Sequence, residues 1–363
     1  MIPMVDLKRQ YLLLKNEIDA AVSDVLAQTQ FILGPNVKAL EKEVADYHNL
    51  SHAVGVANGT DALLLALRAC DIGPGDEVIT TPFTFIATAE VVATLGAKPV
   101  FVDIRPDTFN IDPVKITAAI GPKTKAIIPV HLFGHPADMA PIMDIARKHH
   151  LKVIEDCAQA FGAMYHGQTV GTFGDAGCFS FFPSKNLGGY GDGGMVVTAA
   201  DDIAEKISML RNHGSRERYY HAEIGYNSRL DEMQAAILRV KLKNIDAMNE
   251  ARRQNAALYC SLIRREGVIL PVETTSSKHV YHQFTLRTKN RQAIARALSE
   301  KDIASAVYYP VSLHQQEIFV RMYRTSTPLP VSETCSSEVL SLPMFPEMQP
   351  DEVRLIADVI NHV

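Results

Sequence analysis

Short apolar runs alternate with longer segments of helical periodicity between residues 52 and 211. The runs that we expect to form strands lie at residues 53–57, 76–81, 98–103, 124–130, 151–157, 175–182 and 193–198. The segments that we expect to form helices lie at residues 60–70, 85–96, 112–121, 137–150 and 201–211. Strands and helices that alternate in this way form a mostly parallel sheet with helices on both faces. The pattern therefore predicts a large α/β domain.

The pattern changes beyond residue 231. We expect a long helical stretch at residues 231–266, and strands at 281–288 and 303–310. Further helices are expected at 8–29, after Pro35, and at 290–301, 332–340 and 350–361, with a turn-rich connection at 327–332. We predict two domains, a large one over residues 1–245 and a small C-terminal α+β domain over residues 246–363.

Composition and charge narrow the class of protein. The 363 residues are 47% hydrophobic and 21% charged, and 41 acidic against 36 basic residues give a net charge of −5. This balance argues against a nucleic-acid partner, and no apolar stretch has the length of a membrane span. The first residues lack the apolar core of a signal peptide. Five widely spaced cysteines predict free thiols and a cytoplasmic protein: Cys70, Cys157, Cys178, Cys260 and Cys335.

Polar residues follow several of the predicted strands, at the edge where open α/β sheets bind ligands. Gly59 and Thr60 begin a helix, where free N–H groups suit a phosphate, although a plain helix cap has the same sequence. Asp156 ends a buried strand, so it either faces a cationic ring nitrogen or forms an internal salt bridge. Lys185 follows an apolar strand and can form a Schiff base if it is buried, or be an ordinary loop lysine.

Other familiar patterns are weak. Gly189, Gly191 and Gly194 match GxGxxG, but a predicted strand follows them where a dinucleotide site needs a helix. His131 and His135 are four residues apart, but they lie in a glycine-containing loop without a neighbouring acid. We therefore expect neither a dinucleotide site nor a metal site.

Several motifs in a fixed order are more specific than any of these residues alone. They are ANGTDALLLAL, PFTFIATAE, VIEDCAQAFGA, FSFFPSKNLGGYGDGG and GYNSRLDEMQAAIL. With them the chain resembles the DegT/DnrJ/EryC1/StrS family of sugar-nucleotide aminotransferases, which use pyridoxal 5′-phosphate (PLP). The likeness runs from VDLKRQY to LPMFP and so covers nearly the whole chain. It implies the type I aminotransferase fold and a homodimer with shared active sites.

The resemblance also assigns residues to the cofactor. It makes Lys185 the Schiff-base lysine, Asp156 the carboxylate that keeps the ring nitrogen protonated, and Phe85 the aromatic residue stacked on the ring. Gln159 matches a residue near the 3-hydroxyl group of the ring. The phosphate would be held by Gly59, Thr60 and Ser180, and by Asn227 of the partner subunit.

The implied reaction moves an amino group from L-glutamate to a keto-sugar nucleotide in two stages, with Lys185 moving the protons. The chain looks closest to the branch that aminates C3 of UDP- or dTDP-linked 3-keto sugars. Its amino-sugar product would serve lipopolysaccharide, another surface polysaccharide or a glycoconjugate. The candidate substrate-binding residues are Ser184, Arg229, Tyr308, Tyr309 and His314.

Alternatives stay open at this point. Arg229 could pair with the carboxylate of a sugar acid, but it could also form a salt bridge within the site or contact a phosphate. The family often has His-Tyr-Pro where this chain has Tyr308-Tyr309-Pro310, which weakens the case for a sugar acid. Amination at C4 of a 4-keto-6-deoxy sugar is another alternative. A dehydratase of the family would have histidine in place of Lys185, and a non-catalytic regulator would not need to keep Lys185, Asp156 and Phe85.

Overall fold

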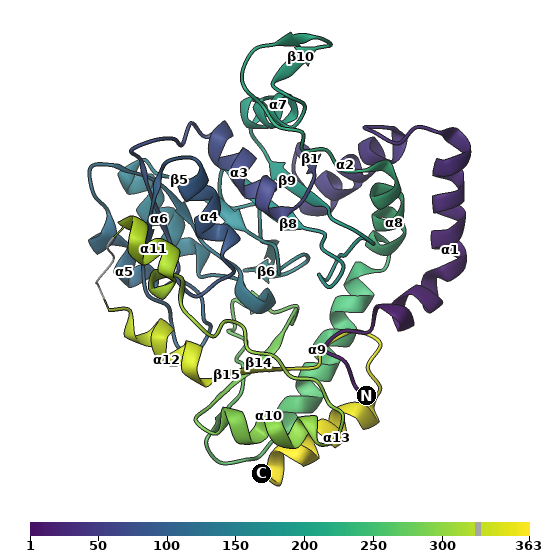
Figure 1. The fold of residues 1–363 in the computed structure, drawn as a ribbon, viewed down its shortest axis with the longest axis vertical. Helices are drawn as coiled ribbons and strands as arrows, with labels where there is room; N and C mark the ends of the chain where they lie inside the picture. The colour runs from purple at the N-terminus through teal and green to yellow at the C-terminus, as the bar shows by residue number, and fades with distance from the viewer. Residues whose placement is uncertain (324–327) are drawn as a thin grey trace.

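The computed structural model describes residues 1–323 and 328–363. Its largest feature is a seven-stranded sheet (Figure 1). In spatial order the strands are β1 (His52–Val56), β9 (Gly194–Thr198), β8 (Ala176–Ser180), β5 (Lys152–Asp156), β4 (Thr124–Ile128), β2 (Glu77–Thr80) and β3 (Lys98–Phe101). Strand β9 runs antiparallel to both neighbours, and the other pairs are parallel. The predicted mostly parallel sheet is confirmed.

Alternate residues of the strands point to opposite faces, and helices bury both faces. On β5, for example, Ile154 packs against one helix layer and Val153 against the other. The first layer contains α3 (Gly59–Ala69) and α7 (Asp201–Leu210), with α4 (Ala87–Thr94) beside them. The opposite layer consists of α2 (Pro35–His48), α5 (Pro113–Ala119), α6 (Met139–His149) and α8 (Glu232–Leu242).

The C-terminal part has its own sheet and core. Strands β12 (Val268–Ile269), β14 (Phe284–Thr288) and β15 (Val339–Leu342) form a three-stranded sheet. The helices packed with it are α9 (Ile245–Leu262), α10 (Arg291–Ser299) and α13 (Pro350–Asn361). Ile2 and Val5 pack into the same core, so both ends of the chain lie in this part (Figure 1).

Smaller elements connect the two parts. Strand β13 (Ser277–Lys278) pairs with β6 (Met164–Tyr165), which pairs with β7 (Gln168–Thr169). Helix α1 (Leu7–Gln28) packs on α8, and the buried carboxylate of Glu232 on α8 accepts hydrogen bonds from the N–H groups of Asn36 and Val37. The remaining elements are β10 (Ser215–Glu217), β11 (Tyr220–His221), the 3₁₀ turns η1 (Leu132–Gly134) and η2 (Leu313–Gln315), α11 (Glu317–Tyr323) and α12 (Pro330–Glu338).

Three expected elements differ in the structure. The long stretch at 231–266 divides into α8 and α9 around Lys243 and Asn244. Residues 303–310 form no strand, because Ile303 and Ala306 make single bridges and the tyrosines beyond them pack with the large part. The helix at 332–340 ends at Glu338, because Val339 begins the buried strand β15. Of the connection at 327–332, Thr327 lies outside the described residues, and its last residues open α12.

The length and polarity of the helices indicate whether any of them could cross a membrane. In residues 1–323 and 328–363, no helix combines the length and the apolar character needed to cross a bilayer.

Candidate active site

The candidate residues come from neighbouring strand ends of the large sheet. Asp156 is the last residue of β5, and Ser180 is the last residue of β8, shortly before Lys185. Phe85 follows β2 at the start of α4, and Gly59 follows β1 at the start of α3. This is the edge at which an open α/β sheet binds ligands, so the topology brings together residues that are distant in the chain.

Asp156 is a buried carboxylate with both oxygens engaged. The Thr88 hydroxyl donates to Oδ2 at 2.7 Å, and the Ala158 N–H donates to Oδ1 at 3.2 Å. Burial raises the pKa of Asp156, while the bond from Thr88 acts in the opposite direction. Within the described part of the chain, no lysine, arginine or histidine forms an ion pair with it. A buried carboxylate in this state fits a cationic group of a ligand, such as a protonated ring nitrogen.

Lys185 lies on a tight loop after β8. Its N–H donates to the Phe182 carbonyl oxygen at 2.8 Å, and the Gly189 N–H closes the loop on the Phe181 carbonyl at 2.8 Å. Burial lowers the pKa of Lys185 to about 8, and the negative charge of Asp156 limits the drop. A lysine with a lowered pKa has more of its amine in the neutral, nucleophilic form, which suits Schiff-base formation.

The start of α3 lies against the end of β8. The Asn58 side chain caps the helix by accepting from the Asp61 N–H at 2.8 Å, so the helix begins at Gly59. A Cβ at Gly59 would lie 2.6 Å from the Cβ of Ser180, which only glycine avoids. The first N–H groups of a helix have no partner within it. Gly59 and Thr60 therefore supply donors beside Ser180, an arrangement that fits a phosphate.

Aromatic residues also belong to the candidate site. The Phe85 side chain is 56% exposed, so one face of the ring is open to a ligand. The Tyr309 ring centroid lies 6.3 Å from that of Phe85 and 5.9 Å from that of Tyr308. Gln159 donates to the Tyr309 hydroxyl at 3.2 Å and accepts from the Phe133 N–H at 2.7 Å. Burial raises the pKa of Tyr309, so its hydroxyl group keeps its proton.

The remaining predicted residues have other partners. Asn227 is exposed and forms a backbone bridge with Asn212. Arg229 donates to the Asn212 side chain at 3.2 Å. His314 lies in η2, and its Nε2 is 3.0 Å from Glu333. Ser184 directly precedes Lys185 in the chain and is half-buried.

Two residues at the site were not predicted from the sequence. Thr88 binds Asp156 and also lies 3.1 Å from the hydroxyl of Thr84; its position one helical turn after Thr84, in the motif that contains Phe85, is a signal that could have indicated it. His282 is buried, and its Nδ1 lies 3.2 Å from Asn186 Oδ1. His282 and Asn186 are distant in the chain, and no sequence pattern predicts their contact.

A buried cluster nearby has the composition of a metal site. Ligand atoms of His131, Glu155 and Cys157 lie within 4.8 Å of one another. However, Nε2 of His131 is 3.0 Å from Glu155, and its Nδ1 accepts from the Ala137 N–H at 2.9 Å. Both ring nitrogens are thus engaged within the protein, and the cluster has the character of a buried polar network.

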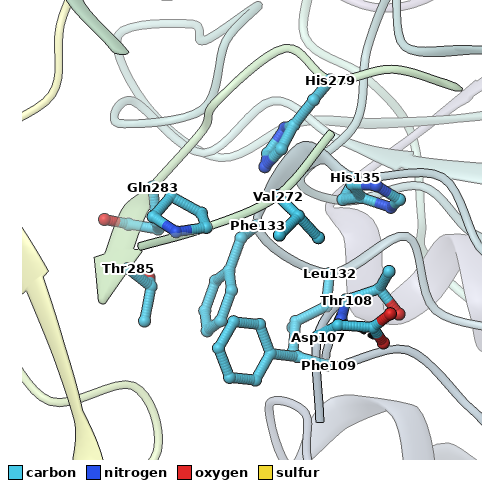
Figure 2. A pocket seen from close by; sticks show the side chains of 11 residues that line it. Asp107, Thr108, Phe109, Leu132, Phe133, His135, Val272, His279, Gln283 and Thr285 are labelled. Carbon is cyan, nitrogen blue, oxygen red and sulfur yellow. Dashed lines mark hydrogen bonds between the residues drawn. The ribbon is translucent and has the colours of Figure 1, made fainter. Parts of the chain in front are cut away.

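A narrow cavity lies next to the site (Figure 2). The rings of Phe109, Phe133, His135 and His279 face it, and its volume is about 10 Å³. That is room for about one water molecule. The cavity is linked to the site because the Phe133 N–H binds Gln159, but it is too small for a substrate.

Comparison with known proteins gives matches over nearly the whole chain. The model of the DegT/DnrJ/EryC1/StrS aminotransferase family matches residues 13–361. The UDP-N-acetyl-3-dehydro-alpha-D-glucosamine 3-aminotransferase of Acidithiobacillus ferrooxidans is 53% identical, over 99% of this chain and 97% of that protein. A pleiotropic regulatory protein of Geobacillus stearothermophilus is 51% identical, over 99% and 97%. The crystal structure of S. venezuelae DesV has a TM-score of 0.97 and 43% identity, over 99% and 98%.

Proposed function

The chain belongs to the DegT/DnrJ/EryC1/StrS aminotransferase family, a family of PLP-dependent enzymes, and we propose that it transfers an amino group from L-glutamate to C3 of a UDP- or dTDP-linked 3-keto sugar. The 53% identity to a protein named as a 3-aminotransferase of a UDP-sugar carries the choice of substrate class and position. Amination at C4 of a 4-keto-6-deoxy sugar nucleotide is the alternative.

The proposed roles of the cofactor residues follow from their chemistry. When bound, PLP supplies an electron-withdrawing ring that stabilises the charge left after proton removal. Asp156 holds a proton on the ring nitrogen, and Phe85 covers one face of the ring. Lys185 would bind the cofactor. Once released, its Nζ would take the proton from Cα of the amino donor and pass it to the cofactor in the first stage, and would move a proton in the opposite direction, from the cofactor to C3 of the sugar, in the second stage. The other residues proposed for the cofactor are Gly59, Thr60, Gln159, Ser180 and Asn227 of the partner.

The proposed substrate residues are the five candidates from the sequence, Ser184, Arg229, Tyr308, Tyr309 and His314. Tyr308 and Tyr309 supply aromatic surface and hydroxyl groups, and Ser184 lies beside the reacting lysine. We assign Arg229 and His314 to the anionic part of the substrate, because a protein with a net charge of −5 attracts a nucleotide only through local groups.

We also propose that the protein is a cytoplasmic homodimer that makes an amino sugar for lipopolysaccharide or another surface glycan. Five free cysteines support a reducing compartment. Exposed Tyr219 and Tyr220 on the β10–β11 hairpin, and exposed Asn227 near it, support a partner surface on that side.

The test is product analysis with L-glutamate and a panel of UDP- and dTDP-linked 3-keto and 4-keto sugars. We expect 2-oxoglutarate and a 3-amino sugar nucleotide, with neither formed by Lys185→Ala. A 4-amino product would replace the proposal by its alternative. Release of no 2-oxoglutarate by protein saturated with PLP would refute both.

A further inference from the structure

Helix α8 carries two polar side chains that reach the loop bearing Lys185. Gln234 and Lys241 are seven residues apart, so they lie two turns apart on one face of the helix. Gln234 Oε1 accepts from the Tyr190 N–H at 2.7 Å. Lys241 Nζ donates to the Gly188 carbonyl oxygen at 2.7 Å and lies 4.2 Å from the centroid of the Tyr190 ring. Both side chains therefore hold residues 188–190.

The surroundings of Lys241 are unusual for a lysine. The residue is 1% exposed. The charge of Glu347 acts on Lys241 from a distance. Among residues 1–323 and 328–363, no carboxylate forms an ion pair with Lys241. A buried ammonium group with so few partners costs folding free energy, and an apolar side chain of similar length would cost less. Its hydrogen bond to Gly188 and its contact with the Tyr190 ring hold it against the loop.

The end of the loop, at Gly188 and Gly189, lies against the residues that precede Lys185. Backbone bonds close residues 181–189 on themselves, from Lys185 to Phe182 and from Gly189 to Phe181. A Cβ at Gly188 would clash with the carbonyl oxygens of Phe182 and Pro183, so the two limbs of the loop touch. Because Gly188 packs directly against the backbone of Phe182 and Pro183, we expect a displacement of Gly188 to shift the residues around Lys185.

We propose that Lys241 is a positioning residue for Lys185, acting through the carbonyl group of Gly188, and that Gln234 is a second support of the same turn. The inference rests on the proposed function in one respect, the role of Lys185 as the reacting amine. Lys241 itself need not touch cofactor or substrate.

The decisive variant is Lys241→Met, which keeps the length of the side chain and removes the ammonium group. We expect only a small change in melting temperature, because the loss of a buried charge stabilises the protein while the loss of the hydrogen bond to Gly188 destabilises it. In protein free of cofactor, the rate of reductive methylation of Lys185, followed by peptide mass spectrometry, should change severalfold. In protein saturated with PLP, the single-turnover rate with L-glutamate should fall roughly ten- to hundredfold, the scale for a misplaced reacting group, at unchanged half-saturation. Lys243→Met, an exposed lysine two residues away, is the matched control.

A second variant keeps the test decisive if Lys241→Met folds poorly. Gln234→Ala removes the other support without changing charge, and the double variant should lose less than the two single losses combined. Lys241→Arg should recover part of the rate. Wild-type methylation and turnover rates in folded Lys241→Met, or in Gln234→Ala if that variant alone folds, would overturn the inference. Failure of the wild-type protein to react with L-glutamate would refute the proposed function, while the methylation rates would still test the position of Lys185.

Discussion

Removal of the cofactor should leave Lys185 far more reactive than an ordinary lysine. Burial lowers its pKa from 10.5 to about 8. At pH 7 roughly a tenth of the amine is then neutral, against roughly one part in three thousand at the ordinary value, a ratio of roughly 300. The rate of reductive methylation of Lys185 between pH 6 and 10 measures this, because only the neutral amine reacts. The profile should bend near pH 8.

The same measurement tests the electrostatic reasoning. Asp156→Asn removes the negative charge that favours protonated Lys185, so the bend should move to lower pH. Exposed Lys243, followed in the same digests, serves as an internal reference for reagent strength. A rate that rises up to pH 10 without a bend in the wild-type protein would show that Lys185 is solvated. An unchanged or higher bend in Asp156→Asn would show that Asp156 is not its neighbouring charge.

Three further predictions concern Gly59 and Thr88 at the site and Asp103 at the contact with α12. Gly59→Ala places a Cβ 2.6 Å from Ser180, so PLP affinity, measured by equilibrium dialysis, should fall at least tenfold while the protein stays folded. Thr88→Val removes the hydrogen bond to Asp156, which should raise the pKa of Asp156 further. The midpoint pH of the change in PLP absorption should then shift upwards, and an unchanged midpoint would contradict this. Asp103→Asn should cost about 2–4 kcal/mol in urea unfolding, since the carboxylate accepts from the Ser332 N–H and hydroxyl at 2.9 and 2.6 Å. Burial opposes ionisation of Asp103, but these bonds lower its pKa overall, so the difference from wild type should shrink as the pH falls through that pKa.

The sequence predicts the central sheet well because each strand is a short apolar run bounded by turn residues, and burial on both faces follows from that pattern. The same pattern indicates Asp156, which ends such a run, and Lys185, which comes shortly after one. The break between α8 and α9 at Lys243 and Asn244 has no proline or glycine to indicate it.

The roles of some residues depend on tertiary contacts, which the sequence does not predict. Thr88 and Lys241 gain their roles only where a distant segment meets them, at Asp156 and at Gly188. The roles of the individual site residues, and the domain boundary at residue 245, stay predictions.

The packing of Ile2 and Val5 determines when this part of the core can form during synthesis. Ile2 pairs with Ile303 and, with Val5, joins the core around β15. Residues 2 and 5 are therefore synthesised well before the segments that they pack against, residues 303 and 339–342. The seven-stranded sheet can therefore form during synthesis while Ile2 and Val5 still lack their partners. Deleting residues 1–5 should therefore leave the seven-stranded sheet intact and destabilise the core around β15.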